Sequence, residues 1–455
     1  MTTRAQVSGY RFGLARAEHA LVRRDARMLH DPMRAQFRAV IAGAVLAVLL
    51  VAGAGIYGVI RPAPSVADAR IVAADTGGLF VLVDDVMHPV PNLASARLVA
   101  GAPLPAKTVA QRSVSSYPRG PALGIPGAPA SLPGPADERE SVWTVCDDPA
   151  AGTAVLAGPP SAEPAVPRAA ALVATSAGKW LLYHRERDGR QTPVRARLAA
   201  DEVAVRRALG LDGAPARPIS QALLNAFPAE PDLSVPDITG SGAPGPGPLR
   251  ELPVGTVIRS LGVDDRPSYF VVLRDGVQPL SAPAAEAVRG ADVASPGAVR
   301  QVSPGVLTAV PVVHRLALDH FPAAPPQLAD AGEVLCRSWS HAGGPGPARE
   351  SMVVSAHLPL PGGARVVTLG SADGDGPGLD GVYVRPGTAE RVAVPGGEYY
   401  VTDAGVRYRL VDVQVGEILG LPGAARPAPW PVLSLLPAGP QLARESALVA
   451  RDLPR

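Results

Sequence analysis

The longest run of apolar positions in the chain extends from Ala39 to Ile60. Its twenty-two residues include no charged side chain. A helix rises about 1.5 Å per residue, so this run is long enough to cross the hydrocarbon core of a bilayer, which is about 30 Å thick. In lipid a helix also satisfies its own backbone hydrogen bonds. The pattern therefore predicts one transmembrane helix. Four glycines within it are expected to form a packing surface for other membrane helices: Gly43, Gly53, Gly55 and Gly58.

The arm before this run, residues 1–38, shows a second helical pattern. Leu14, Ala17 and Leu21 recur at helical spacing and place an apolar stripe on one face. Asp31 stands directly before a proline, which disfavours helical backbone at the preceding residue. We therefore expect a basic amphipathic helix that stops or kinks at Asp31, just before the membrane.

The arm carries eight arginines against three acidic residues. Short arginine-rich flanks stay in the cytoplasm, so we expect the N-terminus inside and the C-terminal domain outside. A basic amphipathic helix suits the anionic headgroups of a lipid bilayer or a groove on a cytoplasmic partner. A cleaved signal peptide and a solvated arm without a partner are the alternatives. Among the arginines, Arg16, Arg23 and Arg27 face away from the leucines. The arginines expected to make these contacts are Arg11, Arg16, Arg23, Arg24, Arg27, Arg34 and Arg38.

Beyond the membrane segment, short apolar runs separated by turn residues predict β-hairpins. The run 79–90 is divided by Asp84-Asp85, and the run 268–280 has the same arrangement around Asp275. In both, a phenylalanine begins the apolar run and a proline follows the turn at the same offset. We interpret the two runs as copies of one unit.

A clearer repeat relates residues 209–233 to 419–442. Arg217-Pro218 aligns with Arg426-Pro427, and prolines and leucines follow at matching offsets. We therefore expect an α+β, mainly β ectodomain, elongated and quasi-twofold symmetric, in which four hairpin-plus-helix repeats surround a core. The expected divisions are 1–38 cytosolic arm, 39–60 transmembrane helix, 61–115 linker and first repeat, 116–175 first core part, 176–240 second repeat, 248–300 third repeat, 301–374 second core part, 375–445 fourth repeat and 446–455 tail.

Composition changes this picture only slightly. Proline (51) and glycine (48) are abundant, but 47% of the residues are hydrophobic, so we expect a folded, loop-rich body. The net charge of +2 gives no reason to expect nucleic acid as a partner. Strand-like runs at 141–146, 333–339 and 351–357 are expected to build the core.

The two cysteines lie in two of those runs. Cys146 and Cys336 are each three residues from a tryptophan, and both fall on the expected outer side of the membrane, where disulfides persist. A bond between them would close a loop of 190 residues, worth about 5 kcal/mol in the chain-entropy model. Two buried free thiols are the alternative. No Cys-x-x-Cys motif occurs, so a disulfide here would be structural.

The N-terminal arm also carries a family resemblance. The runs QVSGYRF (6–12), EHALVRRD (18–25) and RMLHDPMR (27–34) resemble the N-terminal signature of EccB, a membrane component of the type VII (ESX) secretion system of actinobacteria. The single membrane helix followed by a large ectodomain with two cysteines fits that family over essentially the whole chain. The resemblance implies an inner-membrane, single-pass protein with a periplasmic domain. It also implies these partners: the EccC motor ATPase, EccD, EccE, a mycosin protease and other copies of the chain itself.

The family often bears the name ATPase, yet the chain has no Gly-x4-Gly-Lys-Ser/Thr phosphate loop. Its Gly178-Lys179 is followed by Trp180. Ser176 and Lys179 match a Ser-x-x-Lys pattern, but the partner motifs of penicillin-binding enzymes are absent, so a turn is the expected structure. ATP is therefore implied by the resemblance alone, and we expect no catalytic residues.

Metal sites are not expected either. His314 and His320 have no cysteine or carboxylate at the spacing of zinc ligands. The segment 373–380 fails the calcium-loop pattern because a proline occupies its third ligand position, and a glycine-rich hairpin loop is expected there.

The function expected from these features is that of a structural subunit of the type VII secretion membrane complex, linking its cytosolic and periplasmic parts. Two alternatives stay open. One is an ATPase subunit of the same complex. The other is an anchor module that binds the cell wall through the repeats, although aromatic residues are only 4% of the chain.

Overall fold

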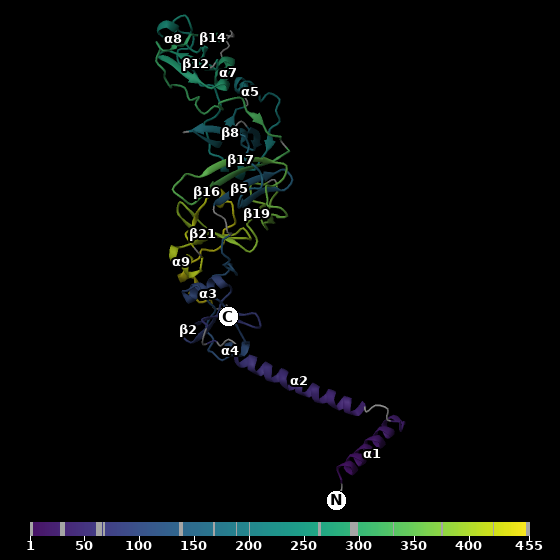
Figure 1. Ribbon diagram of the computed structural model, residues 1–455. Helices are drawn as coiled ribbons and strands as arrows, with labels where there is room; N and C mark the ends of the chain where they lie inside the picture. Colours follow the sequence, from purple (N-terminus) through teal and green to yellow (C-terminus); the bar gives the residue numbers. More distant parts are fainter. Residues whose placement is uncertain are drawn as a thin grey trace.

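The computed structural model describes residues 3–27, 32–60, 66, 69–135, 140–166, 169–187, 189–199, 201–262, 265–291, 299–330, 332–374, 376–421 and 423–451. Side chains are described for these residues except 32–35, 59 and 60. The chain forms an N-terminal helical arm, one long helix and an elongated body of sheets (Figure 1).

The N-terminal arm forms a shorter helix than the sequence predicts. α1 (Arg4–Arg23) ends where Arg24 adopts the left-handed conformation, with φ of 56°. Beyond it, the Asp25 carboxylate accepts a hydrogen bond from the Arg27 backbone N–H at 2.9 Å, and such local bonds compete with helix formation. The prediction that Arg27 lies on this helix is therefore wrong. The stop predicted at Asp31 lies outside the described residues.

The apolar run forms one long helix, as predicted. α2 (Pro32–Ile60) starts several residues before Ala39, with proline in its first turn, where a missing N–H costs nothing. Within the described chain, Gln36–Gly58 is the one stretch long and apolar enough to cross a membrane, and none of it is buried against the rest of the protein. This exposed apolar surface is what a lipid bilayer would cover.

Four sheets in the described part of the body share one four-stranded topology, and one of them, which contains β7, has a fifth strand. In each, three successive strands form an antiparallel meander, a helix follows, and a fourth strand of two or three residues pairs in parallel with the first. We call each sheet with its helices a unit, numbered 1 to 4 along the chain. Unit 1 comprises β1 (Ile71–Ala74), β2 (Leu79–Val83), β3 (Val86–Pro89), α3 (Leu93–Ala100), β4 (Lys107–Val109) and α4 (Gln111–Ser115). Unit 2 comprises β7 (Ala169–Thr175), β8 (Gly178–Arg187), β9 (Arg190–Leu198), α5 (Val203–Ala208), β10 (Arg217–Pro218) and α6 (Gln221–Ala226).

The other two units follow the same order. Unit 3 comprises β11 (Val257–Leu261), β12 (Pro267–Leu273), β13 (Gly276–Leu280), α7 (Ala282–Ala291), β14 (Arg300–Gln301) and α8 (Pro304–Leu307). Unit 4 comprises β20 (Ala389–Val394), β21 (Gly397–Thr402), β22 (Arg407–Leu410), α9 (Val413–Ile418), β23 (Arg426–Pro427) and α10 (Trp430–Leu433). The 3-10 helix η2 (Gly247–Leu249) precedes unit 3, and α11 (Arg444–Ala447) follows unit 4.

Turn chemistry explains the first hairpin. Asp84 and Asp85 both have positive φ, 48° and 60°, as a two-residue type I′ turn requires. Aspartate tolerates this conformation better than most residues because its short polar side chain can bond locally. The hairpin predicted around Asp84-Asp85 is confirmed as β2 and β3.

A six-stranded core sheet lies between units. Its order is β17-β16-β5-β6-β19-β18. The three strands predicted for the core are present as β5, β16 and β17. The bounds are β5 (Ser141–Asp148), β6 (Gly152–Ala157), β16 (Val334–His341), β17 (Arg349–Ser355), β18 (Val367–Thr368) and β19 (Gly381–Tyr383).

Three strands pair across the predicted divisions of the chain. The predicted boundary at 176 separates β7 from β8, although the two pair directly. β19 falls within the predicted fourth repeat, 375–445, but pairs with β6 of the core sheet. The short β15 (Gln327–Leu328), from the predicted second core part, pairs with β7. β19 and β15 pair with partners distant in the chain, so no local pattern marks where they belong, whereas β7 and β8 form a local hairpin that the predicted boundary divides.

The units lie end to end in an elongated body (Figure 1). Unit 1 is next to α2, followed by unit 4, the core sheet, unit 2 and, at the far end, unit 3. α3 of unit 1 contacts α9 of unit 4, and α5 of unit 2 contacts α7 of unit 3. Apolar clusters continue across both joints: Leu98 and Leu419 share one, and Leu209 and Val288 share another. A third cluster, around Trp143, joins the core sheet to units 2 and 4.

Candidate functional site

The exposed face of α1 is the first candidate site. Leu14 and Leu21, predicted to form an apolar stripe, are 52% and 82% exposed. The stripe continues towards the N-terminus through Val7 and Tyr10, which are 44% and 74% exposed. These two residues extend the same spacing of three and four, a signal that was present in the sequence but not used. The stripe lies on a helix surface that nothing in the described part of the chain covers.

The predicted contact arginines divide between the two N-terminal helices. Arg11, Arg16 and Arg23 lie on α1, and Arg24 is its C-cap. Arg16 bends back to donate a hydrogen bond from Nε to the Ala26 carbonyl at 3.1 Å, which fixes the chain after the helix. Arg27 follows this turn, Arg38 lies on α2, and the side chain of Arg34 is outside the described residues. The described arginine side chains of this set are all exposed: Arg11, Arg16, Arg23, Arg24, Arg27 and Arg38.

The four glycines of α2 do not share one face. Gly55 and Gly58 are three residues apart and lie on similar sides, whereas Gly53 and Gly55 are two residues apart and differ by about 200° around the helix axis. A Cβ added at Gly43 or any of the other three would meet no atom within 4 Å. The space beside each glycine is therefore open to another helix or to lipid.

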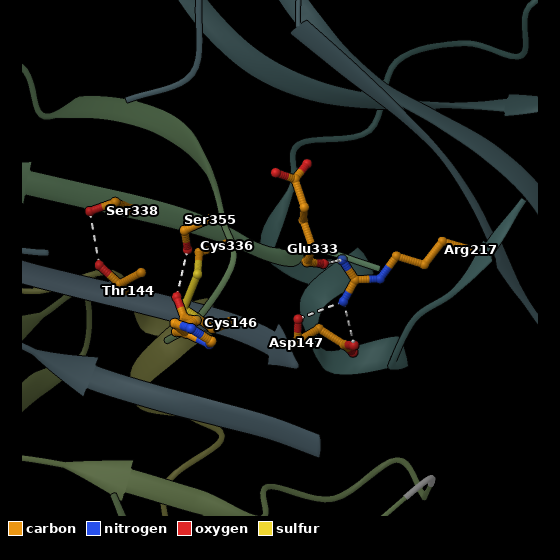
Figure 2. Close-up of a disulfide and its surroundings, with 9 residues drawn as sticks. Thr144, Cys146, Asp147, Arg217, Glu333, Cys336, Ser338 and Ser355 are labelled. Atoms are coloured by element: carbon orange, nitrogen blue, oxygen red, sulfur yellow. Dashed lines mark hydrogen bonds and ion pairs between the residues drawn. A yellow bond between two sulfur atoms is a disulfide. The ribbon is translucent and has the colours of Figure 1, made fainter. Parts of the chain in front are cut away.

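The disulfide is the structural centre of the core sheet (Figure 2). Cys146 of β5 and Cys336 of β16 are directly opposite each other on paired antiparallel strands, and their sulfur atoms are bonded. Both cysteines are fully buried, and the described chain contains no free cysteine. The predicted disulfide is confirmed. It lies on the opposite face of the sheet from Trp143 and Leu335, which pack toward units 2 and 4.

A buried ion pair lies beside the disulfide (Figure 2). The Arg217 guanidinium donates from Nη2 to an Asp147 carboxylate oxygen at 3.2 Å and to the Asp147 carbonyl at 2.6 Å, and from Nη1 to the Glu333 carbonyl. The other Asp147 carboxylate oxygen accepts from the Ser220 N–H at 2.7 Å, just before α6. Burial lowers the pKa of Arg217, and the charge of Asp147 opposes that effect. One side chain thus links unit 2 to both disulfide-bearing strands. Sequence reasoning used Arg217 only to align repeats, because its partners are distant in the chain.

The remaining candidates have structural roles. Ser176 lies in the turn between β7 and β8, as predicted, and Lys179 lies at the start of β8, where it pairs with Ala174. The Asp380 carboxylate accepts backbone hydrogen bonds from Thr153 at 2.7 Å, Asp373 at 2.9 Å and Gly374 at 2.7 Å, which holds the glycine-rich hairpin loop closed. Among the described residues, no three His, Cys, Asp or Glu side chains are placed to hold a metal ion.

His320 lies buried at the joint of units 2 and 3. Its Nε2 donates to the Asp232 carbonyl at 3.1 Å, because a carbonyl can only accept. Burial lowers the pKa of His320 below its ordinary value, and the bond to Asp232 opposes this only in part. The folded state therefore favours the neutral imidazole, whereas the unfolded chain binds a proton at an ordinary pKa of about 6.5.

We expect acid to destabilise the joint through this group. Stability is fully present above the ordinary pKa and falls as the pH drops below about 6.5, since the unfolded state then binds more protons. His320→Gln keeps an N–H donor but cannot titrate, so its melting temperature should fall less between about pH 7.5 and about pH 5. The exposed His314→Gln is the matched control. An unchanged pH dependence in His320→Gln would contradict this assignment.

A single apolar helix with an exposed basic helix before it and a large, disulfide-linked body after it defines a single-span membrane protein. The family model described as "Type VII secretion system ESX-1, transport TM domain B" matches residues 1–454, and the chain belongs to this family, EccB. The resemblance noted in the N-terminal arm is thereby confirmed. EccB proteins are components of ESX inner-membrane complexes.

Curated relatives match over nearly the full length. The chain is 37% identical to the ESX-3 secretion system ATPase EccB3 of Mycolicibacterium smegmatis, covering 99% of this chain and 91% of that protein. It is 35% identical to the ESX-5 secretion system ATPase EccB5 of Mycobacterium tuberculosis, covering 99% and 94%.

Solved structures match in fold as well. The structure of an intact ESX-5 inner membrane complex contains a chain that superposes with a TM-score of 0.75 at 35% identity, covering 100% of this chain and 97% of that one. The EccB3 dimer from the ESX-3 core complex superposes with a TM-score of 0.73 at 33% identity, covering 84% and 100%.

Proposed function

We propose that this chain is a non-catalytic structural subunit that links the cytosolic and periplasmic parts of a type VII secretion complex. The observation that carries the proposal is the order of parts along one chain: an exposed basic helix, one apolar helix that is not buried against the rest of the protein, and a disulfide-linked body. The arginines of the arm favour a cytoplasmic N-terminus, and the disulfide favours a periplasmic body.

The expected partners follow from the relatives. The structures similar to this chain come from an intact inner membrane complex and from a dimer. We infer that this chain assembles with further copies of itself and with the EccC motor ATPase, EccD and EccE, with a mycosin protease near the periplasmic face. The energy for transport then comes from EccC. The α1 stripe is the surface that docks in the cytosol, and α2 packs beside partner helices.

We also infer that the four units are repeats related by a quasi-twofold axis. Phe270 lies opposite Pro279 in unit 3 as Phe80 lies opposite Pro89 in unit 1. The spatial order of units, 1-4-core-2-3, places units 4 and 2 on either side of the core. Such an axis would exchange unit 1 with unit 3 and unit 4 with unit 2.

The pair formed by units 2 and 4 agrees in finer detail. In unit 2, Val173 of the first strand pairs with Trp180 and Arg217. In unit 4, Val392 pairs with Tyr399 and Arg426 in the same register. The α6 and α10 helices, which follow these Arg-Pro strands, contact each other at the centre of the body. This pattern supports an axis between them.

The relatives' names include ATPase, so catalysis needs a direct test. The full chain, purified in detergent and free of other ATPases, should show no ATP turnover above the buffer. Turnover that a single substitution in this chain abolishes would overturn the non-catalytic part of the proposal.

The arm can be tested by substitution. Replacing Arg16, Arg23 and Arg27 with alanine should reduce the amount of assembled complex on blue-native electrophoresis, because the arm loses three of its positive charges. The matched control replaces three exposed arginines in or just before unit 3 with alanine: Arg250, Arg274 and Arg300. An intact complex in normal amount in the arm variant would rule out the docking role.

A further inference from the structure

The last described residues of the chain turn back to its membrane-proximal end. After unit 4, residues 443–451 return to unit 1, the unit nearest α2 (Figure 1). α11 packs on α3 of unit 1. Ala447 of α11 is fully buried in the same apolar cluster as Ala94 and Leu98 of α3.

Hydrogen bonds fasten this segment at its end. The Arg451 backbone N–H donates to the Ala122 carbonyl at 2.8 Å, and the two residues form an antiparallel bridge. The Arg451 side chain donates from Nε to the Gly124 carbonyl at 2.9 Å. At the other end, the Arg444 guanidinium covers Gly101, where an added Cβ would lie 3.2 Å from Nη2. Neither carbonyl acceptor can ionise, so the attachment does not depend on a titrating partner.

The joint of units 2 and 3, at the other end of the body, is covered by a corresponding segment of the chain. After Leu233 the chain continues from unit 2 directly into unit 3, and Val235 and Ile238 pack into the cluster that the two units share. Leu442 stands at the corresponding point of unit 4 and is likewise fully buried. After Leu442, residues 443–451 continue over the joint of units 1 and 4, where α11 packs on α3.

We propose that residues 443–451 are a clasp that fixes unit 1 to unit 4 and thereby sets the direction of the body relative to the membrane helix. Unit 1 is the first sheet after α2. Any movement at the joint of units 1 and 4 therefore changes the orientation of unit 4, the core sheet and units 2 and 3 relative to unit 1. The clasp lies after unit 4 in the chain, so truncation before it leaves the connections between the units uncut. The inference rests on the fold and does not depend on which partners the complex contains.

The joint keeps other contacts when the clasp is absent. The Arg97 guanidinium of α3 donates to the Leu419 carbonyl of unit 4 and to the Leu104 carbonyl of unit 1. The Tyr400 hydroxyl donates to the Pro133 carbonyl at 3.0 Å. Removal of the clasp is therefore expected to loosen unit 1 without unfolding the body.

Hydrogen exchange of the full-length protein in detergent tests the clasp. Truncation after Ala443 should speed the exchange of the α3 amides by at least about tenfold, because local opening then costs less free energy, while the α7 amides of unit 3 keep their protection. Truncation after Arg451 is the matched control and should leave α3 unchanged. Arg451→Pro removes the donor N–H and the side-chain bond to Gly124 but keeps α11, so it should give a smaller effect in the same direction.

Two results would overturn the proposal. One is wild-type protection of α3 in the chain truncated after Ala443. The other is an equal loss of protection in α3 and α7, because the segment would then support the whole fold and not this joint. The α7 amides and the retained disulfide report in the same experiment whether the truncated body is folded.

Discussion

Replacing both cysteines with alanine should lower the free energy of unfolding of the body by about 5 kcal/mol, the largest effect of any change considered. The disulfide closes a loop of 190 residues, and the entropy that such a loop removes from the unfolded chain grows with its length. Alanine at Cys146 and Cys336 avoids burying a new polar group, since both positions are fully buried. Urea unfolding followed by the fluorescence of Trp143 and Trp339, on the same two strands, measures the loss.

Reducing the disulfide of the wild-type protein separates the contribution of loop closure to stability from that of side-chain packing. Reductant should shift the wild-type transition toward that of the double-alanine variant and leave the variant itself unchanged. Equal stability of the oxidised protein and the variant would show that pairing of β5 with β16 alone holds the core sheet together, and would contradict the role given to the disulfide.

Substituting Arg217 with methionine should cost about 3–5 kcal/mol, the second-largest effect. The change leaves the buried Asp147 carboxylate without its cationic partner, and an uncompensated buried charge is strongly destabilising. It also removes the bonds to the Asp147 and Glu333 carbonyls, which join unit 2 to both disulfide strands. The same fluorescence-detected urea unfolding measures this loss.

Two comparisons distinguish charge from packing at this site. Arg315→Met breaks an ion pair with Asp275 whose side chains are 66% and 47% exposed, and such pairs contribute little, so no clear change is expected. Adding Asp147→Asn to Arg217→Met should recover part of the loss, because the buried charge is then gone. A double variant no more stable than Arg217→Met would show that the lost carbonyl contacts, and not the charge, dominate.

Features with a strong local cause could be predicted from the sequence. The length of the run from Ala39 to Ile60 permits little except a membrane-spanning helix. The Asp84-Asp85 turn predicts its hairpin because both residues tolerate positive φ. The disulfide followed from having two cysteines on one side of the membrane.

Features that depend on partners distant in the chain could not be predicted from the sequence. The pairing of β19 with β6 joins Val382 to Val155, and three residues of strand carry no local signal for that partner. The bonds of Arg217 cross 70 residues to Asp147 and 116 to Glu333. The early end of α1 has a local cause, the bond between Asp25 and the Arg27 N–H, but it competes with a helical pattern that continues past it.

The structural role is tested most directly by purifying the tagged full-length chain from native membranes in mild detergent and identifying what comes with it. The account predicts a large assembly that contains further copies of the chain and an FtsK/SpoIIIE-type motor ATPase, and that is lost when residues 1–38 are removed. Recovery of the chain alone, as a monomer or a dimer, from membranes in which the motor is present would contradict it.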